Sequence, residues 1–222
     1  MNKRFIITID GPAGAGKTTL SKALSEKLNY KYIDTGALYR GIALESKKRG
    51  INIDNPDELI NLCSGLDIKF IQVNKSLRLI LNGDDITEII RTPEISMLAS
   101  EISAKPVIRE FLLKIQREMA KEKGVIFEGR DMGTVVFPNA DVKFYLDASA
   151  NKRAERRYEE IKLKNCQNYE GVLNDIIKRD ENDKSRTHSP LKPANDAVLI
   201  DSTSKSIDDV IALMLSYINT LL

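Results

Sequence analysis

The chain has 222 residues, 42% of them hydrophobic and 30% charged, which is the ordinary composition of a soluble globular protein. Its formal net charge of +2 is close to neutral and argues against a nucleic-acid-binding or membrane-surface protein. No segment approaches the ~20 apolar residues of a membrane span, so we expect a cytoplasmic protein without membrane contact. The length favours one domain with inserted subdomains over two independent domains.

The first predicted strand, residues 4–10, leads into a phosphate-binding loop. Its apolar run, FIITI, is shorter than the ~7–15 residues of a secretory signal. The next residues match G-x-x-x-x-G-K-[ST] and open a segment with helical spacing of leucine and alanine. The predicted ATP-binding residues of this loop are Gly11, Pro12, Ala13, Gly14, Ala15, Gly16, Lys17, Thr18 and Thr19.

The loop suits a polyphosphate for physical reasons. Glycine lets backbone N–H groups wrap an anion, and the following helix directs its positive end at the same charge. Lys17 is expected to reach the β- and γ-phosphates, and the Thr18 hydroxyl is expected to ligate Mg²⁺. A glycine-rich turn without a ligand is the alternative, but the flanking strand and helix disfavour it. We therefore predict that the chain binds a nucleoside triphosphate.

Short apolar runs alternate with helical patterns, which predicts βαβ units around a parallel sheet. The expected strands are residues 4–10, 30–34, 125–128, 141–147 and 197–201. They end on Asp10, Asp34, Glu128, Asp147 and Asp201. Ligands of open α/β sheets bind beyond the carboxyl ends of the strands, so these acids should rim a binding crevice. We expect Asp147 and Asp201 to cap the following helices, and Asp34 and Glu128 to have functional roles.

Amphipathic spacing predicts helices over residues 106–122 and 206–221, both covering the sheet. Ser206 and Asp209 have the spacing of a capping box at the start of the second helix. A basic pair of helices is expected over residues 150–187.

Residues 67–82 depart from the α/β pattern. Apolar and polar residues alternate in two runs, with Asn74 and Lys75 between them, which predicts an inserted antiparallel hairpin. The expected organisation is a single domain with a core of residues 1–34, 106–149 and 188–222, an insertion of residues 35–105, and a helical appendage of residues 150–187.

Two further motifs follow predicted strands: Asp34-Thr35-Gly36-Ala37-Leu38-Tyr39-Arg40 and Glu128-Gly129-Arg130-Asp131-Met132-Gly133-Thr134. With Ser100 and the segment 106–109, they make the chain resemble cytidylate kinase of the bacterial type over essentially its whole length. That family belongs to the nucleoside monophosphate kinases. The resemblance implies an α/β P-loop fold of three layers with a five-stranded parallel sheet. It also implies that the insertion binds the monophosphate and carries a small antiparallel β element, and that the appendage holds a short helical lid and the base-reading helix.

Phosphoryl transfer between two nucleotides brings two polyanions together and requires fixed cations around the transferred group. Arg40, Arg109 and Arg130 come from three segments, and guanidinium groups suit a bidentate grip on phosphate. The resemblance implies that these three hold the acceptor phosphate. Arginines without a role are the alternative, more so for Arg109 than for the other two. Asp131 is expected to orient the neighbouring arginine or the acceptor ribose.

Arg179, Asp183 and Arg186 are spaced to share one helix face with the apolar Val172 and Ile176. A carboxylate can accept from the cytosine amino group and an arginine can donate to the ring acceptors, whereas uracil presents an oxygen to the carboxylate. An exposed salt-bridge triad on the helix is an equally good interpretation without the resemblance. The CMP-binding residues that the resemblance implies are Thr35, Arg40, Ser100, Arg109, Arg130, Asp131, Arg179, Asp183 and Arg186.

Arg153, Arg156 and Arg157 crowd like charges in the predicted lid, which a polyphosphate would relieve on closure. A solvated basic face is the alternative. The expected catalytic residues are Lys17, Arg130, Arg153 and Arg157, with Arg156 assigned to ATP. Glu128 stands where the family usually has Asp, and its additional methylene changes its reach.

Three further residues receive no catalytic assignment. His188 is given no role, because this chemistry depends on positioning and charge. Cys63 and Cys166 have no metal or redox spacing and are expected to be reduced thiols.

The predicted function is transfer of the γ-phosphoryl of ATP to CMP or dCMP with Mg²⁺, by a monomeric enzyme. Another small P-loop kinase, acting on an alcohol or a different monophosphate, is the nearest alternative. A GTP-dependent switch would carry an Asn-Lys-x-Asp motif, which the sequence does not contain.

Overall fold

The computed structural model of the chain describes residues 3–73, 76–162 and 168–222. They form two compact units, the first made of Met1–Tyr32 and Glu122–Leu222 and the second of Ile33–Lys121. Within the described ranges, no helix is both long and apolar enough to cross a membrane. Each unit is taken separately below.

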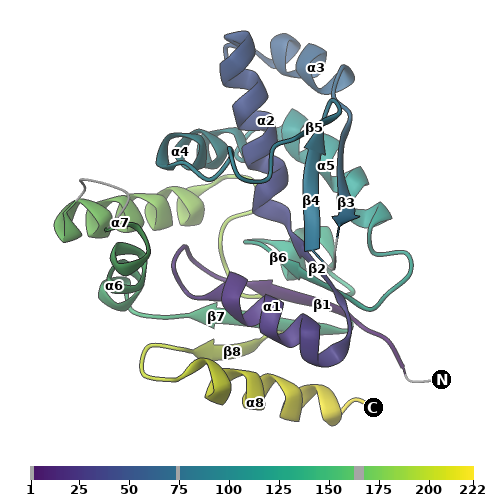
Figure 1. Cartoon of the computed structure of the whole chain (residues 1–222), viewed down its shortest axis with the longest axis vertical. Helices are drawn as coiled ribbons and strands as arrows, with labels where there is room; N and C mark the ends of the chain where they lie inside the picture. Colours follow the sequence, from purple (N-terminus) through teal and green to yellow (C-terminus); the bar gives the residue numbers. More distant parts are fainter. Residues whose placement is uncertain (1–2, 74–75, 163–167) are drawn as a thin grey trace. The chain divides into compact units, whose positions relative to one another are not determined.

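The first unit is built on a five-stranded sheet of the predicted parallel kind (Figure 1). Its strands are β1 (Ile6–Asp10), β2 (Lys31–Asp34), β6 (Val125–Glu128), β7 (Val142–Asp147) and β8 (Val198–Asp201), in the order β2-β6-β1-β7-β8. In this register Ile9 lies between Glu128 of β6 and Phe144 of β7, so neighbouring strands end side by side. All five strands end on the acids identified in the sequence.

Helices α1 (Lys17–Leu28) and α8 (Ile207–Asn219) pack against each other and against this sheet (Figure 1). Their shared core includes Leu20 and Leu24 of α1, Met214 of α8, and Phe144 of β7. This arrangement confirms that the second predicted amphipathic helix covers the sheet. The capping box of Ser206 is also confirmed, since its hydroxyl accepts from the Asp209 N–H and its own N–H donates back.

The expected basic pair of helices is present as α6 (Ala150–Ile161) and α7 (Tyr169–Ser185), which pack against each other. Ala154, Val172 and Ile176 form their small common core. A short π-helical turn, η1 (Met132–Val136), follows β6 and packs beside β1. Such turns are rare and occur frequently at functional sites.

The second unit has its own hydrophobic core. It contains α2 (Thr35–Arg49), α3 (Pro56–Ser64), β3 (Ile68–Val73), β4 (Ser76–Leu81), β5 (Asp84–Asp85), α4 (Pro93–Ile102) and α5 (Pro106–Glu118). The antiparallel pairing of β3 with β4 confirms the predicted hairpin, and β5 extends it. Asn74 and Lys75, expected between the two strands, lie outside the described residues. Leu38, Leu79, Ile102 and Ile108 are fully or almost fully buried in this core.

Two features differ from the sequence expectations. Helix α5 was expected to cover the sheet, but its buried residues Ile108 and Leu112 join the core of the second unit, together with residues of α2, α3 and α4. Asp147 and Asp201 do not cap the following helices, because Ser149 and Ser206 do so. The two aspartates accept hydrogen bonds from the backbone of their own turns instead.

The chain leaves the first unit and returns to it at neighbouring positions. The Lys31 N–H donates to the Gly124 carbonyl at 2.9 Å, and the Lys31 ammonium lies 3.1 Å from the Glu122 carboxylate. The segment between these residues therefore begins and ends at neighbouring positions of the first unit.

Candidate active site

The loop between β1 and α1 has the geometry that the sequence motif predicts. Gly11 has φ = 145° and Gly14 has φ = 77°, both unfavourable for other residues. A Cβ on Gly11 would lie 1.9 Å from the Leu146 carbonyl oxygen, so only glycine fits there. Helix α1 begins at Lys17, after Gly16 with φ = 92°. The motif therefore lies in its expected strand–loop–helix context.

Three carbonyl groups of this loop are each held by a cation. The Lys17 ammonium donates to the Pro12 carbonyl at 2.7 Å, and Arg153 Nη1 donates to the Ala13 carbonyl at 2.9 Å. Arg156 Nη1 lies 3.4 Å from the Ala15 carbonyl. Because a trans peptide directs its C=O and its N–H in opposite directions, these bonds turn the following N–H groups away from the three cations. Exposed N–H groups of a glycine-rich loop form an anion-binding concavity.

Charge at the base of the loop is poorly compensated. Burial lowers the pKa of Lys17 to about 7, and repulsion by Arg130 and Arg179 contributes to the shift. Burial likewise raises the pKa of Asp10 to about 7, against hydrogen bonds from the Gly133 and Met132 N–H groups. These bonds, 2.7 and 2.9 Å long, attach the π-helical turn to the end of β1. A bound polyphosphate would supply the negative counter-charge that the Lys17 ammonium group lacks.

Thr18 and Glu128 make direct contact. The Thr18 hydroxyl donates to Glu128 Oε1 at 2.9 Å, and the Tyr32 hydroxyl donates to Glu128 Oε2 at 2.5 Å. Since the Thr18 proton is directed at the carboxylate, the lone pairs of its oxygen remain available to a cation. Among the described residues, no group of three His, Cys, Asp or Glu side chains could hold a metal. This donor set fits Mg²⁺, which is commonly held by few protein oxygens together with substrate phosphates and water.

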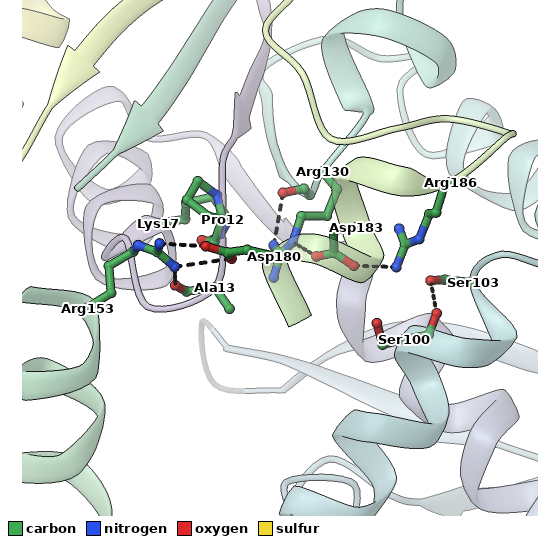
Figure 2. A network of polar contacts seen from close by, with 11 residues as sticks. Pro12, Ala13, Lys17, Ser100, Ser103, Arg130, Arg153, Asp180, Asp183 and Arg186 are labelled. Atoms are coloured by element: carbon green, nitrogen blue, oxygen red, sulfur yellow. Dashed lines mark hydrogen bonds and ion pairs between the residues drawn. The ribbon is translucent and has the colours of Figure 1, made fainter. Parts of the chain in front are cut away.

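Asp183 of α7 joins two arginines in a buried cluster (Figure 2). Its carboxylate accepts from Arg130 Nε at 2.9 Å and also from Arg186 Nη2. Burial opposes ionisation of Asp183, but Arg130, Arg186 and Arg179 hold its pKa below the usual range. Burial would also lower the pKa of Arg130, yet Asp183 and Glu128 raise it above its ordinary value. Asp183 is 1% exposed, so the interpretation as an exposed triad on the helix is wrong.

The three arginines of α6 have different surroundings. Arg153 is buried, and its Nη atoms contact both carboxylate oxygens of Asp180 at 3.1 and 2.5 Å. Arg156 donates to the Ser202 hydroxyl and to the Ser202 carbonyl. Arg157 is partly exposed and pairs with Glu160 at 2.9 Å. Arg153 and Arg156 are thus not a solvated basic face, whereas Arg157 lies near the surface.

Two predicted groups lie in the second unit. Arg40 Nη2 forms an ion pair with Asp34 at 2.7 Å, and the same aspartate caps α2 by accepting from the Ala37 N–H. Arg109 Nη1 donates to the Ser103 carbonyl at 3.1 Å. The Ser103 hydroxyl in turn donates to the Ser100 carbonyl at 2.7 Å (Figure 2). Arg109 and Ser100 are therefore joined through the end of α4.

Other predicted residues are placed as follows. Thr35 is buried at the first position of α2, and Asp131 is buried at the start of η1. Arg179 is close enough to Lys17 and Asp183 to affect the pKa of both. Thr19 is exposed on the first turn of α1. Cys63 is a buried free thiol, and Cys166 lies outside the described residues.

Sequence analysis missed Asp180, Ser202 and Tyr32. Asp180 could have been found, because it lies three residues before Asp183 and so near the same helix face. Ser202 and Tyr32 follow or belong to predicted strands but match no motif, so no pattern distinguished them.

Comparison with known proteins identifies the family of the chain. The cytidylate kinase family model matches residues 7–220. A cytidylate kinase of Geobacter sulfurreducens is 50% identical over 215 residues, covering 96% of this chain and 92% of that protein. One of Pasteurella multocida is 46% identical over 219 residues, covering 98% and 96%.

The solved structure of a shikimate kinase from Bacteroides thetaiotaomicron has a TM-score of 0.50 at 15% identity, and the match covers 98% of this chain and 99% of that one. At this identity the likeness shows the fold alone. Sequence family and fold agree. The chain belongs to the cytidylate kinase family of ATP-dependent nucleoside monophosphate kinases.

Proposed function

We propose that this kinase transfers the γ-phosphoryl of ATP to CMP or dCMP with Mg²⁺ in the donor site. The observation that carries the proposal is the buried Asp183 carboxylate between Arg130 and Arg186. It links the predicted base-reading residues directly to a predicted phosphate-binding arginine. A site that pairs buried polar groups with its substrate rejects analogues that leave those groups unpaired.

On the donor side, the loop N–H groups bind the ATP phosphates, and Lys17 balances the charge that moves with the γ-phosphoryl. Thr18 and Glu128 would hold Mg²⁺, which supplies neutralisation of the β- and γ-oxygens when bound. Arg153 and Arg156 act on ATP through the loop carbonyl groups that they bind. Arg157, which is partly exposed, contacts the polyphosphate from the solvent side.

On the acceptor side, Arg40, Arg109 and Arg130 bind the phosphate of the monophosphate. The other proposed CMP contacts are Thr35, Ser100, Asp131, Arg179, Asp183 and Arg186. In the proposed complex Asp183 accepts from the cytosine amino group, as a carboxylate can. Uracil would present an oxygen there, and repulsion would disfavour it.

A coupled assay with ATP and the acceptors CMP, dCMP, UMP, AMP and shikimate tests the assignment. We expect the highest kcat/KM with CMP or dCMP and a marked preference for them over UMP. Faster turnover of UMP, AMP or shikimate would refute the proposed acceptor. Omission of Mg²⁺ is expected to abolish transfer. Monomeric state, cytoplasmic location and the predicted domain boundaries stay predictions.

A further inference from the structure

Asp180 is a buried acid that the roles above leave unassigned. It lies on α7 and is 8% exposed. Both its carboxylate oxygens face the guanidinium of Arg153, at 3.1 and 2.5 Å (Figure 2). A bidentate pair of this kind fixes the plane of a guanidinium as well as its position. Asp180 therefore decides where the donors of Arg153 point.

Two further donors of Arg153 are directed at backbone carbonyl groups. Its Nε donates to the Ala148 carbonyl at 2.8 Å, and its Nη1 donates to the Ala13 carbonyl of the phosphate loop at 2.9 Å. The loop also packs directly on this part of α6, since a Cβ on Gly14 would lie 3.0 Å from Arg153 Cβ. Arg153 thus connects Asp180 of α7 to the Ala13 carbonyl of the phosphate loop.

The bond to Ala13 has a consequence for anion binding. Because the peptide is planar and trans, holding the Ala13 carbonyl on Arg153 directs the Gly14 N–H to the opposite side. If the peptide rotated, a carbonyl oxygen would replace a donor in the concavity and repel an anion. The orientation of this peptide therefore matters for phosphate affinity.

We propose that Asp180 is a positioning residue that orients the phosphate loop through Arg153. The proposal rests on the assigned role of the loop in binding the ATP phosphates. Asp183, one turn further along α7, binds Arg130 through one carboxylate oxygen, at Nε. One helix thereby fixes an arginine for each of the two substrates.

The test compares Asp180→Asn with Glu181→Gln, which removes the same charge from an exposed neighbour on α7. Binding of ADP is measured by calorimetry, so that no transfer to an acceptor is needed. We expect the Kd for ADP to rise about tenfold in Asp180→Asn, since small misplacements of a binding group are costly, and to stay unchanged in Glu181→Gln. Wild-type affinity in Asp180→Asn, or tighter binding, would overturn the proposal. If the wild-type protein bound ADP but did not phosphorylate CMP, the proposed function would fail while this test remained decisive.

Hydrogen exchange of the ligand-free protein separates positioning from general stabilisation. In Asp180→Asn, exchange should accelerate in the loop, residues 11–18, and remain as in the wild type in α8 (Ile207–Asn219). An equal acceleration in both segments would show a merely structural role and would contradict the proposal. Should Asp180→Asn not fold, Asp180→Glu retains the charge and displaces the carboxylate, and the same loop-specific pattern is expected of it.

Discussion

The phosphate loop and the segment after β6 each place a largely buried cation beyond the end of a central strand, but the charges of the two cations are balanced differently. Lys17 donates to the carbonyl of Pro12, and the pKa of Lys17 falls to about 7 because of burial and nearby arginines. Arg130 is bound to the Asp183 carboxylate, and its pKa is raised. Lys17 is poorly compensated, whereas Arg130 is paired with a carboxylate.

The difference in charge compensation indicates two tasks in a binding site, positioning a ligand and responding to its charge. A paired arginine is already ionised and fixed, so it can position a ligand without first acquiring a partner. A poorly compensated lysine gains most of its counter-charge from the ligand, so its contribution grows with the charge that the ligand brings. We infer that the donor loop responds to substrate charge, while the segment after β6 provides fixed geometry. The following changes test this contrast.

Lys17→Ala should have the largest effect. The charge of Lys17 matters most as the phosphoryl group moves, so we expect kcat to fall by about 10³-fold or more. Lys22→Ala, an exposed position of the same helix, is the matched control and should retain wild-type turnover. Unchanged kcat in Lys17→Ala would show that the loop needs no cation at this position.

Asp183→Asn should remove the fixed compensation of Arg130. We expect the KM for CMP to rise by roughly 10–100-fold, because replacing the buried carboxylate by a neutral amide leaves Arg130 and Arg186 without their counter-charge. The preference for CMP over UMP should fall more than the affinity for ATP. Steady-state kinetics with both acceptors measures this, with Glu181→Gln as the control. A preserved CMP preference would assign base recognition to other residues.

The pH dependence of ADP binding tests the poorly compensated lysine. A free-protein pKa of about 7 means that Lys17 is mostly neutral at pH 8. The bound polyanion favours the charged form, so binding should take up a proton. The Kd should then rise above pH 7 by up to about tenfold per pH unit. Calorimetry at pH 8 in buffers of different ionisation enthalpy measures this uptake, and Lys17→Met should abolish it. Binding without proton uptake would mean that Lys17 is already charged.

Tyr32→Phe should have the smallest effect of the set. It removes one of the two hydroxyl groups that hold Glu128 and leaves the bond from Thr18. We expect the Mg²⁺ concentration for half-maximal ADP binding to rise about threefold, because outer-shell partners tune metal ligands. Titration of Mg²⁺ by calorimetry measures it, and Tyr217→Phe, at a partly exposed position of α8, serves as the control. An unaltered Mg²⁺ requirement would separate Glu128 from the metal.

Local patterns predicted the parts of the fold that local chemistry determines. The glycine-rich loop, the strands that end on acids and the capping box of Ser206 each depend on neighbouring residues, and each is found in the structure. Asp34 shows the limit of such patterns. Its position suggested a functional role, but it also caps α2 and pairs with Arg40.

Long-range pairings could not be predicted in the same way. Arg153 meets Asp180 across 27 positions and Ala13 across 140 positions of the sequence. No spacing rule connects such residues. The sequence therefore showed the arginines of α6 only as a cluster of like charges and did not distinguish their individual partners. The packing of α5 was missed for a similar reason, since its amphipathic face is compatible with either hydrophobic core.

The chain leaves the first unit and returns to it at neighbouring positions, and this has an evolutionary consequence. Lys31 contacts both Gly124 and Glu122, so the segment between them begins and ends at one place. Insertions with adjacent ends are tolerated because the host unit keeps its own path and core. Recombination that exchanged the segment between these two points for another would therefore leave the path and the hydrophobic core of the phosphate-loop unit intact.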